Sequence, residues 1–156
     1  MHGLFPLLDR VVLFLAQGLG VGRSQYAPGT IGTLISLPLV WLLSSVGRPV
    51  VVSFVIVFGL FSVLVAGRAS RYLDREDDPS IVIDEIAGFL VAMALVPLTL
   101  WTLLAGFVIF RLLDIFKPPP IGLLERRIRG GAGIVADDVV AGIMTNIVLQ
   151  VGVWWL

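Results

Sequence analysis

Long runs without a charged residue constrain this 156-residue chain more than any other feature. Four such runs follow one another, at 33–45, 49–67, 86–110 and 139–156. Charged residues make up only 14% of the chain, against about 25% in soluble domains, and 58% of the residues are hydrophobic. There are too few polar side chains to cover the surface of a water-soluble protein of this size. Lipid must therefore surround much of the surface. We expect an all-α fold, a polytopic membrane helical bundle forming a single domain over 1–156.

The charge balance argues against a nucleic-acid-binding protein. Eleven basic and eleven acidic residues cancel, and no block of like charge forms the basic patch that phosphate backbones require. Cysteine is absent, which excludes disulfides, thiolate zinc sites and a cysteine nucleophile. The only histidine, His2, lies near the terminus, so acid–base catalysis by histidine has no good candidate.

The positions of the arginines predict how the runs cross the membrane. Arginines precede the first run and follow the second and third, and the positive-inside rule places these three intervals in the cytoplasm. Because these intervals lie on the same side of the membrane, the chain must cross the membrane an even number of times between one interval and the next. The first two runs therefore read as a helical hairpin, and the third must go out and return, with a break near Val96 and Pro97. Amphipathic helices at the membrane surface are expected at 5–18 and 121–129.

Five acidic residues lie at the ends of these runs. Asp84 and Glu85 begin the third run, Asp114 follows it, and Asp137 and Asp138 are expected to open the last helix. Carboxylates beside hydrocarbon are costly and usually mark a functional site. Gathered on one face they would repel one another unless a divalent cation neutralised them, and Mg²⁺ suits an all-oxygen site that also holds a phosphate. The alternative is that the helix macrodipole favours acids at helix N-termini, which fits four of them but not Asp114.

Cations flank one of these acids. The spacing of Arg111, Asp114 and Lys117 places all three on one broad helical face, an arrangement that suits a metal-bound phosphate. A simple Arg111–Asp114 ion pair is an equal alternative.

A loop at 27–33, Ala-Pro-Gly-Thr-Ile-Gly-Thr, leads into a helix. Free backbone amides at Gly29 and Thr30, together with two threonine hydroxyls, would face an anion at the positive end of the helix dipole. An ordinary turn and helix cap is the alternative.

The last helix carries small residues and one amide on the side of Asp138. Ala141, Gly142 and Thr145 follow Asp138 on one stripe, where they would permit close helix packing. Asn146 would hydrogen-bond a ligand or join two helices. The glycine-rich segment 130–133 is interpreted as a flexible lead into this helix, and the acidic loop 74–79 as a solvated turn.

Four of these blocks, in this order, resemble the bacterial phosphatidylglycerophosphatase A family: 27–33, 84–88, 110–121 and 137–142. The resemblance implies a Mg²⁺-dependent lipid phosphatase that converts phosphatidylglycerophosphate to phosphatidylglycerol. It also implies a multi-pass protein of the bacterial cytoplasmic (inner) membrane, with its active site facing the cytoplasm. The sequence does not predict an oligomeric state.

The residues then supply a hypothesis for the site. The expected metal ligands are Asp84, Glu85, Asp114, Asp137 and Asp138. The expected catalytic residues are Asp84, Glu85, Asp114, Lys117 and Asp138. The expected substrate-binding residues are Gly29, Thr30, Arg111, Lys117 and Asn146. The alternative function is a small cation- or proton-coupled transporter that uses the clustered acids, although that class normally places its acids near mid-span.

Overall fold

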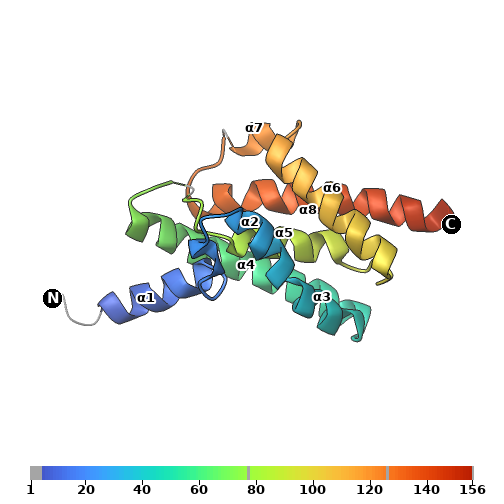
Figure 1. The fold of residues 1–156 in the computed structure, drawn as a ribbon, viewed down its shortest axis with the longest axis horizontal. Coiled ribbons are helices and arrows are strands. Elements are labelled where there is room, and N and C mark those ends of the chain that lie inside the picture. Colours follow the sequence, from blue (N-terminus) through green and yellow to red (C-terminus); the bar gives the residue numbers. More distant parts are fainter. Residues whose placement is uncertain (1–4, 77, 126, 156) are drawn as a thin grey trace.

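The computed structural model describes residues 5–76, 78–125 and 127–155 (Figure 1). Within these ranges every regular element is a helix, so the all-helical fold class predicted from the sequence is confirmed. His2 and Asp77 of the acidic loop lie outside the described residues. The described elements are α1 (Phe5–Ala16), η1 (Val21–Arg23), α2 (Pro28–Ile35), α3 (Leu37–Ser44), α4 (Arg48–Leu73), α5 (Ile83–Met93), α6 (Leu100–Phe116), α7 (Ile121–Glu125) and α8 (Gly130–Trp155).

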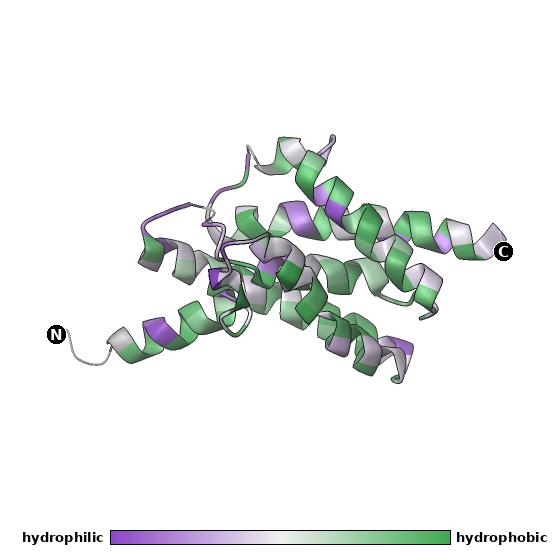
Figure 2. Cartoon of the chain, viewed as in Figure 1, coloured by the Kyte–Doolittle hydropathy of each residue, from purple (hydrophilic) through white to green (hydrophobic). Residues whose placement is uncertain are grey.

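Two helices, α4 and α8, are long and apolar enough to cross a membrane. Each has 26 residues, so each spans about 39 Å at 1.5 Å per residue, more than the ~30 Å of a hydrocarbon core. Only 22% of the apolar stretch of α4 is buried. The core helix of a soluble protein would be mostly buried, so the exposed apolar face of α4 favours contact with lipid. Hydrophilic residues instead concentrate in loops and helix ends on the side of α1 and α7 (Figure 2).

Helix α5 lies at the centre and packs against α2, α3, α4, α6 and α8. The chain leaves the helical path after Met93, and the loop 94–99 contains Val96 and Pro97, where the break was expected. Proline cannot continue the helical hydrogen-bond ladder, and α6 then starts with a capping box between Thr99 and Thr102. Helix α6 packs back along α5, where Phe89 and Phe110 have ring centroids 5.7 Å apart. The two ends of the third run therefore lie near each other.

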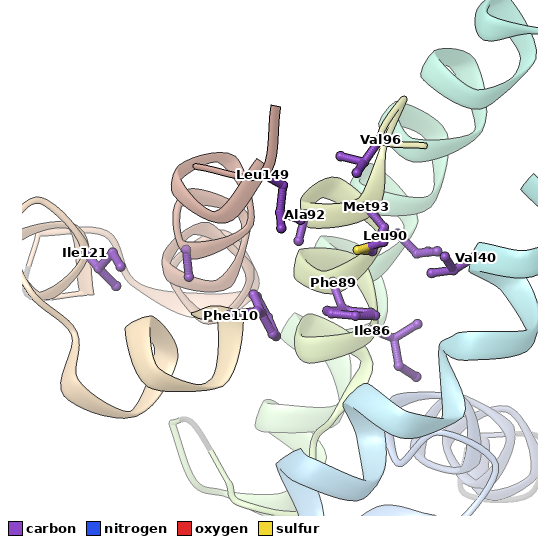
Figure 3. Packing of buried hydrophobic residues seen from close by; sticks show 11 residues of the cluster. Val40, Ile86, Phe89, Leu90, Ala92, Met93, Val96, Phe110, Ile121 and Leu149 are labelled. Atoms are coloured by element: carbon purple, nitrogen blue, oxygen red, sulfur yellow. The ribbon is translucent and has the colours of Figure 1, made fainter. Parts of the chain in front are cut away.

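Helices α5 and α8 cross with their backbones almost in contact. A Cβ atom added to Gly142 would lie 2.2 Å from the carbonyl oxygen of Gly88, and one added to Gly88 would lie 2.6 Å from that of Asp138. Small residues allow such approach, as the stripe on α8 predicted. Around this crossing, apolar side chains of α5 form one buried cluster with residues of α3, α6, α7 and α8 (Figure 3).

The last helix begins earlier than the sequence analysis expected. Helix α8 starts at Gly130, so the predictions of a flexible glycine lead and of Asp137 and Asp138 at the helix start are wrong. The reason is packing: a Cβ on Gly131 would lie 2.0 Å from the carbonyl oxygen of Val63 in α4. Asp137 and Asp138 consequently lie in the third turn, where the macrodipole does not explain them.

The two expected surface helices have different outcomes. The helix expected at 5–18 is present as α1. The helix expected at 121–129 is much shorter, because α7 contains only Ile121–Glu125.

Candidate active site

Three carboxylates meet at the crossing of α5 and α8. Asp84 and Glu85 stand in the first turn of α5, and Asp138 faces them from α8. One oxygen of each lies within 4.8 Å of the others. Asp84 is only 6% exposed and Asp138 only 3%. The close helix crossing brings these acids together, although Asp138 is far from the other two in the sequence.

This cluster fits a hard divalent cation. Glu85 Oε2 and Asp138 Oδ1 are buried and have no hydrogen-bond partner within the described structure. Burying an ionised carboxylate without compensation costs several kcal/mol. A cation such as Mg²⁺, which prefers carboxylate oxygens, would compensate both oxygens at once.

Arg111 connects this cluster to α6. Its Nη1 atom lies 2.5 Å from Asp114 Oδ2 and 4.0 Å from Glu85 Oε1, and the side chain is largely buried. The ion pair that the sequence analysis gave as one alternative is thus present. Glu85 in turn belongs to the three-carboxylate cluster that includes Asp138 of α8. One guanidinium therefore stands among several carboxylates contributed by three helices.

The remaining acid and the lysine form a second pair. Lys117, at the C-terminal end of α6, places its Nζ atom 2.7 Å from Asp137 Oδ2. Asp137 is therefore joined to Lys117, beside the three-carboxylate cluster rather than within it. The expected set of five metal ligands separates into a cluster of three and two acids that each bind a cation. The metal roles of all five acids stay predictions.

The N-terminus of α2 lies directly against these charges. A Cβ added to Gly29 would lie 2.1 Å from Glu85 Oε1 and 3.1 Å from Arg111 Nη2, so only glycine fits here without displacement. The first helical hydrogen bond runs from the Ile31 amide to the Ala27 carbonyl. The amides of Gly29 and Thr30 precede that ladder, at the positive end of the helix.

The second threonine of the loop has another role than expected. Thr33 is fully buried, and its hydroxyl donates to the Gly29 carbonyl at 2.9 Å, inside the helix. It therefore stabilises the first turns of α2 and does not face a ligand.

Asn146 lies away from the acids, about two turns after Asp138 along α8. Its Nδ2 atom donates to the carbonyl oxygens of Val91, Ala92 and Ala94, at 3.3, 3.0 and 2.7 Å. The Val91 carbonyl also accepts the Ala94 amide, but the end of α5 leaves the carbonyls of Ala92 and Ala94 without helical donors, and lipid offers none. The substrate-binding role expected for Asn146 finds no support in this position, whereas the alternative role of joining two helices does.

The sequence analysis missed a polar network that fixes the start of α5. Gln17 is 4% exposed and donates to Ser80 Oγ at 3.1 Å, and Arg23 Nε donates to Gln17 Oε1 at 2.7 Å. The amide of Val82 donates to the carbonyl of Ala16 at 2.9 Å. These bonds anchor the segment just before Asp84. The one signal in the sequence is a polar Gln17 following an amphipathic helix.

The fold and the site together define the class of protein. It is an all-helical protein with helices of membrane-spanning length and a buried centre of acids and cations beside a helix N-terminus. A family model described as phosphatidylglycerophosphatase A matches residues 14–153. The chain therefore belongs to the phosphatidylglycerophosphatase A family, as its resemblance predicted, and it is a lipid phosphatase.

Individual relatives agree with this assignment. Phosphatidylglycerophosphatase A of Escherichia coli (strain K12) is 37% identical over 144 residues, covering 90% of this chain and 83% of the relative. The Haemophilus influenzae protein of the same name is 35% identical over 144 residues, covering 91% and 88%. A Bacteroides thetaiotaomicron protein named putative phosphatidylinositol-3-phosphatase is 30% identical over 149 residues, covering 91% and 93%. No solved structure matches this chain.

Proposed function

We propose that this chain hydrolyses the terminal phosphate monoester of phosphatidylglycerophosphate in a Mg²⁺-dependent reaction at the cytoplasmic surface of a bacterial inner membrane. The observation that carries the proposal is the cluster of three buried carboxylates within 4.8 Å, with two oxygens that lack hydrogen-bond partners in the described structure. Beside it stand a guanidinium and a helix N-terminus, both suited to phosphate.

Asp84, Glu85 and Asp138 would hold the metal ion. Asp114 and Asp137 belong to the proposed set as outer members, because each also binds a cation of α6. Bound Mg²⁺ supplies positive charge at the phosphate oxygens and makes a coordinated water more acidic.

The cations and the start of α2 would bind the phosphate. Arg111 and Lys117 supply positive charge from α6, and the amides of Gly29 and Thr30 with the Thr30 hydroxyl supply donors from α2. Phosphoryl transfer depends mainly on positioning and on stabilising charge at the oxygens, which these groups provide. A carboxylate of the cluster can accept the proton of the attacking water. The reaction breaks the phosphate ester bond and releases inorganic phosphate and phosphatidylglycerol.

The proposed topology is multi-pass. Helices α4 and α8 span the bilayer, α2 and α3 lead from the cytoplasmic side to the start of α4, and α5 and α6 form a hairpin. The arginine-rich ends face the cytoplasm. The acyl chains of the substrate then stay in lipid while its headgroup enters between α2, α5, α6 and α8. This arrangement requires no extraction of the lipid.

Phosphate release from phosphatidylglycerophosphate by the purified protein tests the proposal. We expect release with Mg²⁺, none with EDTA, and a loss of at least about a hundredfold in Asp84→Asn and Asp138→Asn. Asp74→Asn is the matched control, because Asp74 is exposed and its left-handed backbone suits asparagine. Binding of Mn²⁺, followed by electron paramagnetic resonance, should be lost in the two cluster variants alone. Release that persists in EDTA would contradict the metal site.

A further inference from the structure

A second cavity lies at the opposite end of α5 from the acids. It has a volume of about 210 Å³ and is bounded by α3, the start of α4, the end of α5 and the loop 94–98. Met93 lies nine residues after Asp84, which corresponds to about 14 Å along the helix. No residue of the proposed catalytic centre lines this cavity. It is therefore a separate feature of the fold.

The inner wall of the cavity is apolar. Val40, Val51, Leu90, Met93 and Val96 line it, and each is at least 93% buried. Figure 3 shows Val40 pointing from α3 toward Leu90 and Met93 of α5. The volume is below the ~300 Å³ at which pockets for drug-sized molecules begin, so the cavity accommodates a segment of hydrocarbon chain and not a complete polar headgroup.

A single cation stands at the rim. Arg48 lines the cavity, and it is the only charged residue between positions 24 and 67 of the sequence. The other two hydrophobic runs that reach this end, 86–110 and 139–156, carry no charge at all. Within the described parts of the chain Arg48 forms no ion pair. Among residues 5–76, 78–125 and 127–155, no acidic side chain therefore neutralises the positive charge of Arg48.

An apolar pocket with a cation at its mouth is complementary to an anionic amphiphile. We propose that this cavity binds one anionic phospholipid, with a segment of an acyl chain inside and the phosphate on the Arg48 guanidinium. Guanidinium groups bind phosphate through paired hydrogen bonds. A phospholipid whose headgroup carries no positive charge of its own should bind the unpaired Arg48 guanidinium more tightly than a zwitterionic phospholipid does. The site is independent of phosphate hydrolysis at the other end of α5.

Native mass spectrometry of the full chain, released from an uncharged detergent, tests this site. The probes are phosphatidylglycerol and phosphatidylcholine with identical acyl chains. We expect the wild-type protein to retain one phosphatidylglycerol about tenfold more tightly than phosphatidylcholine, equivalent to about 1.4 kcal/mol. Arg48→Gln should abolish this preference, and Val46→Phe, at the exposed rim of the cavity, should reduce retention of both lipids.

Three controls distinguish lipid held at Arg48 from a general effect of charge and from lipid held at the catalytic centre. Arg75→Gln also removes one positive charge, but beyond the opposite end of α4, and should keep the preference. Asp138→Asn should also keep the preference for phosphatidylglycerol. If the lipid were instead bound at the catalytic centre, this substitution would alter its retention. Arg48→Gln should release phosphate from phosphatidylglycerophosphate at the wild-type rate and unfold at the wild-type temperature. A preference that survives Arg48→Gln, equal retention of the two lipids by the wild type, or retention of free fatty acid but of neither phospholipid would overturn the proposal.

Discussion

Gly142→Ala tests whether the crossing of α5 and α8 sets the geometry of the acidic cluster. The new Cβ atom would lie 2.2 Å from the Gly88 carbonyl oxygen, whereas even close carbon–oxygen contacts in proteins are about 3.3 Å. The two helices must therefore separate by about 1 Å. Asp138 and Asp84 each lie one helical turn before these glycines, so the separation moves their carboxylates apart.

We expect Gly142→Ala to lower both the stability of the fold and the rate of turnover. Overpacking of this kind destabilises a protein by about 1–3 kcal/mol, and a displacement of about 1 Å at a catalytic centre can reduce the rate about a hundredfold. We expect Gly142→Ala to fold, to unfold at a lower temperature, and to release phosphate about a hundredfold more slowly with weaker Mn²⁺ binding.

Steady-state phosphate release at several Mg²⁺ concentrations, with thermal unfolding in the same detergent, measures these effects. Gly152→Ala is the matched control, because this glycine lies on the same helix and an added Cβ would have no neighbour within 4 Å. Wild-type turnover and wild-type Mn²⁺ affinity in Gly142→Ala would refute the reasoning that the helix crossing positions the cluster.

Three further predictions concern other parts of the molecule. Gly29→Ala would place a Cβ 2.1 Å from Glu85 Oε1, and we expect a loss of kcat/KM of about a hundredfold in the phosphate-release assay. Asn146→Leu removes the donor to three carbonyls, and a fall in stability of about 2 kcal/mol should appear in thermal unfolding, with kcat largely retained. The hydroxyl and amide of Ser80 hold the pKa of Asp78 below its usual value. The resulting stability is present above the pKa of the unfolded chain and lost as the pH falls through the folded pKa. Asp78→Asn should therefore lower the unfolding temperature at pH 6, and by progressively less as the pH falls below the unfolded pKa.

The elements that the sequence predicted well follow from hydropathy and proline. The third run had to break near Pro97 because the arginine pattern requires both of its ends on one side, and the loop 94–99 contains that break. The meeting of Asp84, Glu85 and Asp138 follows from the same reversal together with the small residues of α8. Such features depend on local composition and on a chain that must satisfy its backbone inside lipid.

Other features depend on contacts that no local pattern encodes. Glycines at 130–133 suggest a loop in water, but here they form a helix because α4 packs against them. The spacing along α8 placed Asn146 near the side of Asp138, yet only the position of the α5 end decides which groups its amide reaches. The bond between Gln17 and Ser80 joins positions 63 residues apart. A single sequence does not show that two side chains so far apart along the chain lie close together in the fold.

The short length of α5 has a consequence for the flow of water and ions. Its 11 residues cover about 16 Å, roughly half of a ~30 Å hydrocarbon layer. In the proposed topology α5 alone would not cross this layer, and the amide of Asn146 donates to the carbonyls of Ala92 and Ala94 at its end. In the proposed topology, the charged centre would open toward one aqueous compartment only. A hydrolase built in this way can take up water and discharge its anionic product without creating a leak across the membrane that it modifies.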